Sequence, residues 1–183
     1  MKQWLTKSAN WKFIVPLSVL VLFFNLYLFP STAVTYQGKS LQPLDLKMSY
    51  SKDEVTELFN KMNEDGRSSY YSGIIITDSI YPFVYTLLLI LLFVFFIKMI
   101  GNNQSKFYLL LLFPIGIMLS DFAENMNTMH MLNHFPFIDD ASAKRGSFFS
   151  GFKWYLTIIT ISILFFLFSY WICLLFQKKY ISK

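Results

Sequence analysis

Four long apolar segments dominate this sequence, and they restrict the possible folds more than any other feature. Crossing the hydrocarbon core of a bilayer, ~30 Å thick, takes about 20 mostly apolar helical residues. The segments that meet this requirement are residues 13–29, 80–97, 107–127 and 154–176. Because runs such as residues 87–96 lack the alternation of a barrel strand, only helices can satisfy the backbone in lipid. We therefore predict one all-α domain, residues 1–183, that is an integral membrane bundle of four transmembrane helices.

The basic residues predict the orientation of this bundle. One set falls in three short segments on a single side: Lys2, Lys7, Lys12, Lys98, Lys106, Lys178, Lys179 and Lys183. The other basic residues are spread over two longer connections and are interleaved with acids. Since short cytoplasmic segments are enriched in lysine and arginine, we expect both termini to be cytoplasmic, in a cytoplasmic (inner) membrane. The net charge of +5 then suits anionic lipid headgroups, and we expect no nucleic-acid partner.

The first apolar segment leaves a second interpretation open. Lys2 and Lys7, the apolar stretch and the small residues at 31–33 also resemble a cleavable signal sequence. The apolar run is long for a signal sequence, however, and Trp11 is typical of an interfacial anchor of a membrane helix. We retain a permanent first transmembrane helix.

The only sizeable extramembrane segment covers about residues 31–77. Within it, Ser51 and Glu54 match a capping box, in which each side chain satisfies a backbone amide at a helix start. Apolar residues follow at helical spacing, so we predict a short amphipathic helix that reaches about Asn63 and stops at Asp65-Gly66. Without strands this segment cannot build its own core. We expect its helix to cover the outer mouth of the bundle or to lie on the lipid surface.

Polar residues interrupt the third apolar segment near its outer end. Asp121, Glu124, Asn125 and Thr128 stand at positions i, i+3, i+4 and i+7, which is one helix face. Counted from Lys106 at ~1.5 Å per residue, Asp121 lies about 22 Å and Glu124 about 27 Å from the cytoplasmic side. Ionisable groups within a membrane segment are rare and usually face a bundle interior or a wet cavity. This face is the strongest candidate for a functional site.

The second and fourth segments carry polar faces at the same level. Asp78, Tyr81 and Tyr85 share one face, and Lys153 shares another with Thr157 and Thr160. We predict that the three faces meet in an outward-facing pocket whose ligand-binding residues are Asp78, Tyr81, Tyr85, Asp121, Glu124, Asn125 and Lys153. Three acids then face one base. Either protons neutralise some of the carboxylates, or a cation or cationic ligand lies among them.

Less specific interpretations of these residues remain. The face with Asp121 and Glu124 could be an inter-helix clamp paired to Lys153, and that lysine could extend to the interface. Asp78 could be a charge favoured near a helix N-terminus. His130 and His134, at i and i+4, could bind a metal, as could the three carboxylates. No phosphate loop, catalytic triad order, zinc signature or haem motif is present, so no cofactor is indicated.

Several short motifs resemble a group of uncharacterised prokaryotic four-helix membrane proteins. They are Gly66-Arg67 with Tyr70, then Asp78 with Tyr81-Pro82 and Tyr85, then Asp121 with Glu124-Asn125. The resemblance spans about residues 50–153. It implies the four-helix plan and no activity.

Three functions agree with these features. The first is a membrane protein whose acidic pocket binds a cation, a proton or a polar or cationic small molecule, within a transport or sensing assembly. The second is a membrane-embedded enzyme that acts on a lipid or isoprenoid, with one carboxyl as general acid and its neighbour as base. The third is a structural or accessory subunit that binds a second copy or another membrane protein.

Overall fold

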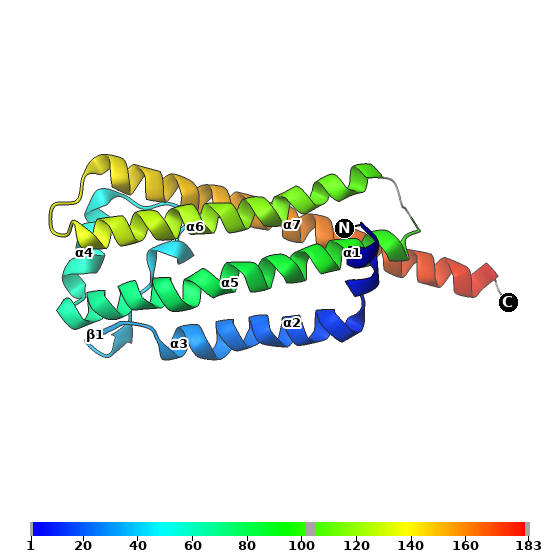
Figure 1. Ribbon diagram of the computed structural model, residues 1–183, viewed down its shortest axis with the longest axis horizontal. Coiled ribbons are helices and arrows are strands. Elements are labelled where there is room, and N and C mark those ends of the chain that lie inside the picture. The colour runs from blue at the N-terminus through cyan, green and yellow to red at the C-terminus, as the bar shows by residue number, and fades with distance from the viewer. Residues whose placement is uncertain (1, 102–104, 182–183) are drawn as a thin grey trace.

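The chain folds into a bundle of four long apolar helices. The structure is a computed structural model that describes residues 2–101 and 105–181. Four helical stretches are long and apolar enough to cross a membrane: Trp11–Ser31, Glu64–Met99, Tyr108–Asn133 and Asp140–Gln177. Figure 1 shows these helices side by side, with both ends of the chain at one end of the bundle and α4 (Lys52–Lys61) at the other. The predicted all-α, four-span membrane fold is confirmed.

The first span is not a regular helix throughout. After the short α1 (Lys2–Ser8), α2 (Trp11–Phe23) passes into a π-helical turn, η1 (Phe24–Leu28), and ends in α3 (Phe29–Ser31). A π-turn widens the backbone by one residue, and such turns are frequent at functional sites. This one carries Asn25 on its first turn.

The segment between the first two spans is shorter and more ordered than the sequence indicates. A minimal hairpin pairs β1 (Thr35–Tyr36) with β2 (Lys39–Ser40), and a 3-10 turn, η2 (Leu44–Leu46), follows. This small hairpin was not predicted from the sequence. Helix α4 begins with the predicted capping box, in which both reciprocal hydrogen bonds are present.

Helix α4 covers the end of the bundle, the first of the two locations predicted for it. Its buried residues Val55, Leu58 and Phe59 pack in one apolar cluster with Met131 of the third span and Ala143 of the fourth. A second apolar cluster, toward the chain termini, includes Phe93, Val94 and Leu167. Asp78, Asp121 and Lys153 lie between these two clusters along the second, third and fourth spans.

The long helices extend beyond the predicted ranges because hydropathy detects only their apolar part. Helix α5 runs over Glu64–Met99, so Asp65 and Gly66 belong to its first turn and do not form the predicted stop. The Asn63 side chain caps this start by accepting a hydrogen bond from the Gly66 amide at 2.8 Å. Acids in a first turn favour a helix start, which explains Glu64 and Asp65.

The third connection is likewise mostly helical. After the 3-10 stretch η3 (Ser105–Leu111), helix α6 covers Leu112–Asn133 and α7 covers Asp140–Ile181. Asp139 accepts a hydrogen bond from the Ser142 amide at 2.7 Å and thereby caps the start of α7. Most of the connection between the predicted spans 107–127 and 154–176 is therefore helical, and Lys153 lies well inside the last helix.

Candidate functional site

Lys153 is the basic centre of the buried polar site. From α7, its Nζ atom lies 3.2 Å from Oδ1 of Asp121 and 2.7 Å from Oε2 of Glu124, both on α6. The three side chains are 10%, 13% and 0% exposed, respectively. The Lys153 side chain therefore does not extend to the membrane–water interface. Its ammonium group is shared by the carboxylates of Asp121 and Glu124.

Asp121 links three of the spans. Its Oδ2 atom accepts a hydrogen bond of 2.9 Å from the Tyr85 hydroxyl on α5, while Oδ1 faces Lys153. The interpretation of this face as an inter-helix clamp is thus supported, because α5, α6 and α7 meet at one carboxylate. Polar contacts of this kind contribute about 0.6 kcal/mol each on average inside membranes.

Glu124 is the most completely buried acid of the described chain. Its side chain is 0% exposed, and neither carboxylate oxygen accepts a hydrogen bond of acceptable geometry from the described residues. The ion pair to Lys153 is therefore its principal compensation. A buried carboxylate with one partner depends strongly on that partner, since an unpaired buried charge is costly.

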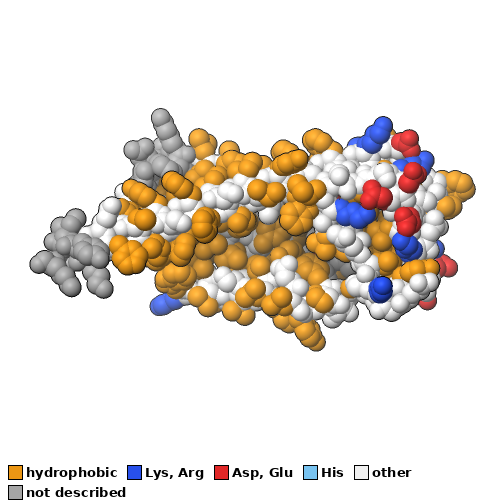
Figure 2. All heavy atoms as spheres, turned by 180° about the vertical axis from the view of Figure 1, so that it is seen from behind, with side chains coloured by type: hydrophobic (Ala, Val, Ile, Leu, Met, Phe, Trp, Pro, Cys, Tyr) orange, Lys and Arg blue, Asp and Glu red, His pale blue; other side chains and the backbone are white. Residues whose placement is uncertain are grey.

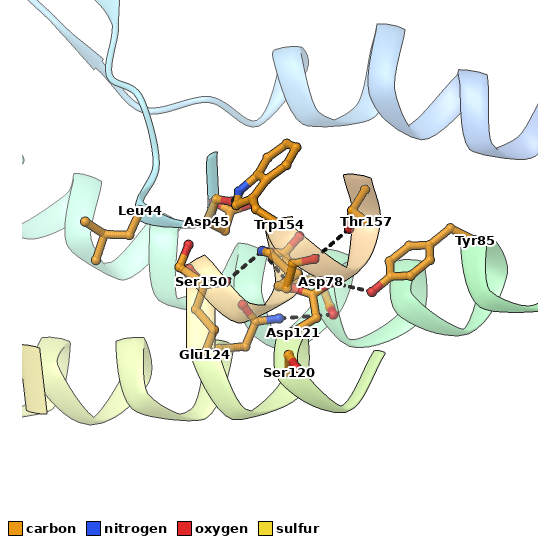
Figure 3. Close-up of polar contacts among 12 residues, drawn as sticks. Leu44, Asp45, Asp78, Tyr85, Ser120, Asp121, Glu124, Ser150, Trp154 and Thr157 are labelled. Atoms are coloured by element: carbon orange, nitrogen blue, oxygen red, sulfur yellow. Dashed lines mark hydrogen bonds and ion pairs between the residues drawn. The ribbon is translucent and has the colours of Figure 1, made fainter. Parts of the chain in front are cut away.

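Asp45 joins these residues, and the sequence reasoning missed it. It lies in η2, which is attached to the fourth span: the Trp154 indole donates to the Asp45 carbonyl at 3.1 Å, and the Ser150 hydroxyl donates to the Lys47 carbonyl. Figure 3 shows Asp45, Asp78, Asp121 and Glu124 gathered around one region, although Asp45 comes from outside the spans. Burial raises the pKa of the Asp45 carboxyl; the Lys153 ammonium opposes this shift, and nearby Asp121 adds to it.

The sequence holds only one signal that could have identified Asp45. Its two neighbours, Leu44 and Leu46, are apolar, and an acid between apolar residues in a short turn suggests a docked segment. Leu44 is in fact fully buried, and its amide donates to the Tyr70 hydroxyl at 3.2 Å. That docking places the Asp45 carboxylate over the site.

A cavity of about 760 Å³ borders this polar cluster. It lies between the first span on one side and α5, α6 and α7 on the others, with residues 40–46 at its extramembrane end. Its charged lining residues are Asp45, Asp78, Asp121 and Lys153. The rest of the lining is mostly apolar, and Figure 2 shows the molecule hollowed between two rows of apolar side chains.

The structure distributes the predicted site residues between the cavity wall and the helix contacts behind it. Those that line the cavity are Asp78, Tyr81, Tyr85, Asp121 and Lys153. Glu124 and Asn125 do not line it: Glu124 lies behind Lys153, and the Asn125 amide donates to the Asp78 carbonyl at 3.4 Å.

Asn25 lines the cavity from the opposite side. From the π-turn η1, its amide donates to the Tyr81 hydroxyl at 2.5 Å and to the Val21 carbonyl at 2.8 Å. The ring of Tyr81 also stacks on Phe24, with ring centroids 5.1 Å apart. The first span is thereby attached to α5 at the level of the acids.

The histidines of α6 lie outside this site. His130 and His134 are exposed, and the His134 ring contacts the His130 carbonyl at 2.9 Å through Nδ1. In residues 2–101 and 105–181, no group of three or more histidine, cysteine or acidic side chains is arranged to hold a metal ion. The polar site contains the ion pairs of Lys153 and borders the cavity.

The chain is a polytopic membrane protein with four candidate spans, and Asp121, Glu124 and Lys153 form buried ion pairs between α6 and α7. Comparison of the chain with protein-family models, with curated proteins and with solved structures finds no match.

Proposed function

We propose that the cavity binds a small organic cation at its acidic end. The observation that carries this proposal is the unequal charge of the lining: among the described residues, Asp45, Asp78 and Asp121 line the cavity with Lys153 as the only base. The charge of Lys153 is already shared by Asp121 and Glu124. Within the described chain, neither Asp45 nor Asp78 has a basic group within 4.0 Å.

The size of the cavity supports an organic cation over a bare metal ion. A volume of about 760 Å³ lies within the range of about 300–1,000 Å³ that is typical of small-molecule sites. Tyr81 and Tyr85 add aromatic rings to the lining. Aromatic rings attract quaternary and primary ammonium groups by about 0.5–2 kcal/mol.

The predicted orientation of the bundle determines from which side of the membrane a cation would reach this site. The acidic end lies next to residues 40–46, at the end of the bundle opposite to both termini. With the termini cytoplasmic, as the lysine distribution predicts, the cation would come from the outer side. The protein would then act as the binding component of a transport or sensing assembly.

The binding of tetramethylammonium tests this proposal. The full-length protein in lipid nanodiscs is titrated by calorimetry and compared with the double variant D45N/D78N. We expect at least a tenfold loss of affinity, because a hydrogen bond or ion contact to a charged group contributes about 1.5–3 kcal/mol. The matched control is Asp53→Asn, an exposed acid of α4, which should bind as the wild type does.

The pH dependence gives an independent check. Because burial raises the pKa of Asp45, this carboxyl must lose a proton before it can hold a cation. Binding should therefore strengthen as the pH rises above the ordinary range of an aspartate, and the effect should be smaller in the D45N variant. Absence of binding by a correctly folded wild-type protein, or equal binding by D45N/D78N, would refute the proposal and leave the cluster as a clamp.

A further inference from the structure

We propose that the ligand is an amphiphile: its ammonium group binds the acidic end, and its alkyl chain lies along the cavity toward the membrane centre. This inference rests on the proposed function and specifies its ligand class. It also specifies the route, because such a molecule would enter sideways from the bilayer between the first span and α7.

The lining changes from polar to apolar in the same direction on two helices. On α5, the polar residues Asp78, Tyr81 and Tyr85 are followed by Leu88, Leu89 and Leu92. At ~1.5 Å per helical residue, the distance from Asp78 to Leu92 is about 21 Å. The lining therefore extends over this length of α5, and its charged residues lie toward one end.

Helix α7 shows the same change. Lys153, Trp154 and Thr157 border the acidic end, and Ile161 and Leu164 border the apolar end. A small polar solute would leave this second half without a polar partner. A molecule with an apolar chain satisfies both halves.

The side of the cavity between the first span and α7 is where an apolar chain can pass. The first span is attached to α5 through the hydrogen bond from Asn25 to Tyr81, whereas α7 is attached to α6 through the ion pairs of Lys153. Val21 of the first span and Ile161 of α7 both line the cavity. Figure 2 shows the surface hollowed between two rows of apolar side chains.

The buried carboxylate of Glu124 is a further argument that a charged head group binds at the acidic end of the cavity. Glu124 is 0% exposed, and its oxygens lack hydrogen bonds of acceptable geometry within the described chain. It holds Lys153 at 2.7 Å and so draws the ammonium toward α6. Asp45 and Asp78 are then left to an incoming cation on the cavity side.

Two probes with the same head group separate this inference from the proposed function. Tetramethylammonium has the head alone, and dodecyltrimethylammonium adds an alkyl chain. Both are titrated into the full-length protein in nanodiscs, and each affinity is compared between the wild type and a variant in which the apolar half is filled. Comparing variants with the same probe removes the contribution of nonspecific partition into lipid.

The filling variants are Leu89→Trp and, independently, Ile161→Trp, which enlarge two lining residues on different helices. The control is Ile158→Trp, an exposed residue of α7 that does not line the cavity. We expect each filling variant to lose at least tenfold in affinity for dodecyltrimethylammonium and to bind tetramethylammonium as the wild type does. The control should bind both probes normally.

The remaining outcomes distinguish the amphiphile inference from the proposed cation-binding function. If the filling variants bind both probes like the wild type, the ligand chain does not occupy the apolar half and the amphiphile inference is wrong, while the cation site stands. If they lose both probes while melting at the wild-type temperature, the two halves are not separate compartments and the inference is again wrong. If the wild type binds neither probe, the proposed function itself fails.

Discussion

The replacement Lys153→Met tests the buried ion pairs, which are the best-defined feature of the site. Methionine keeps an unbranched chain of similar length and removes the charge. Glu124, with 0% exposure, then loses its ion-pair partner, whereas Asp121 keeps the 2.9 Å hydrogen bond from Tyr85. Removing one member of a buried pair typically costs about 3–5 kcal/mol, because the other charge remains buried and uncompensated.

Proton uptake limits this cost. The Glu124 carboxyl can accept a proton, which for an ordinary glutamate at pH 7 costs about 3.7 kcal/mol at 1.36 kcal/mol per pH unit. We therefore expect Lys153→Met to lower the free energy of unfolding by about 3–4 kcal/mol at pH 7 and by much less at pH 5. For a chain of this length, that loss corresponds to a decrease of roughly 6–16 °C in melting temperature.

The assay is thermal unfolding in one detergent at pH 5 and pH 7, extended to a double-mutant cycle. In a Glu124→Gln background, Lys153→Met leaves no buried carboxylate at that position, so its cost should fall by about 1–3 kcal/mol. Lys61→Met serves as the surface control, because Lys61 pairs with Glu57 at 2.5 Å while 41% of its own side chain is exposed. A loss below about 1 kcal/mol for Lys153→Met, or strict additivity in the cycle, would refute this reasoning.

Two further predictions concern packing and pH. A Cβ atom at Gly146 would overlap the Tyr50 hydroxyl and lie 2.7 Å from Nδ2 of Asn127, so Gly146→Ala should cost about 1–3 kcal/mol of stability; Gly73→Ala, where nothing lies within 4 Å, should be neutral or stabilising by up to about 1 kcal/mol. Equal melting temperatures for the two alanine variants would contradict this. Because the pKa of Asp45 is raised on folding, its protonated form stabilises the protein below its ordinary pKa, and this stabilisation is lost as the pH rises through the raised value. Asp45→Asn should therefore remove part of the loss of stability on going from about pH 4 to neutral pH, and an unchanged pH profile would count against the buried position of this carboxyl.

The features that could be predicted from the sequence are those set by neighbouring residues along the chain. Apolar length predicts the four spans, and the Ser51 and Glu54 spacing predicts the start of α4. Helical spacing alone also places Asp121 and Glu124 on one side of their helix. The helix ends were less predictable, because hydropathy cannot detect the polar turns at Glu64–Asp65 and after Asp140.

By itself, then, the sequence determined the four-span plan, the presence of a short extramembrane helix and the level at which polar residues interrupt the spans, since hydrophobicity and helical periodicity are local properties. Only the tertiary structure decided which of those residues meet. It paired Lys153 with both α6 acids, turned Glu124 away from the cavity wall and brought Asp45 over the site from a turn outside the spans. Such contacts depend on how each helix is rotated and on where the connecting segment docks. These are set by packing between residues far apart in the chain, which no local pattern records.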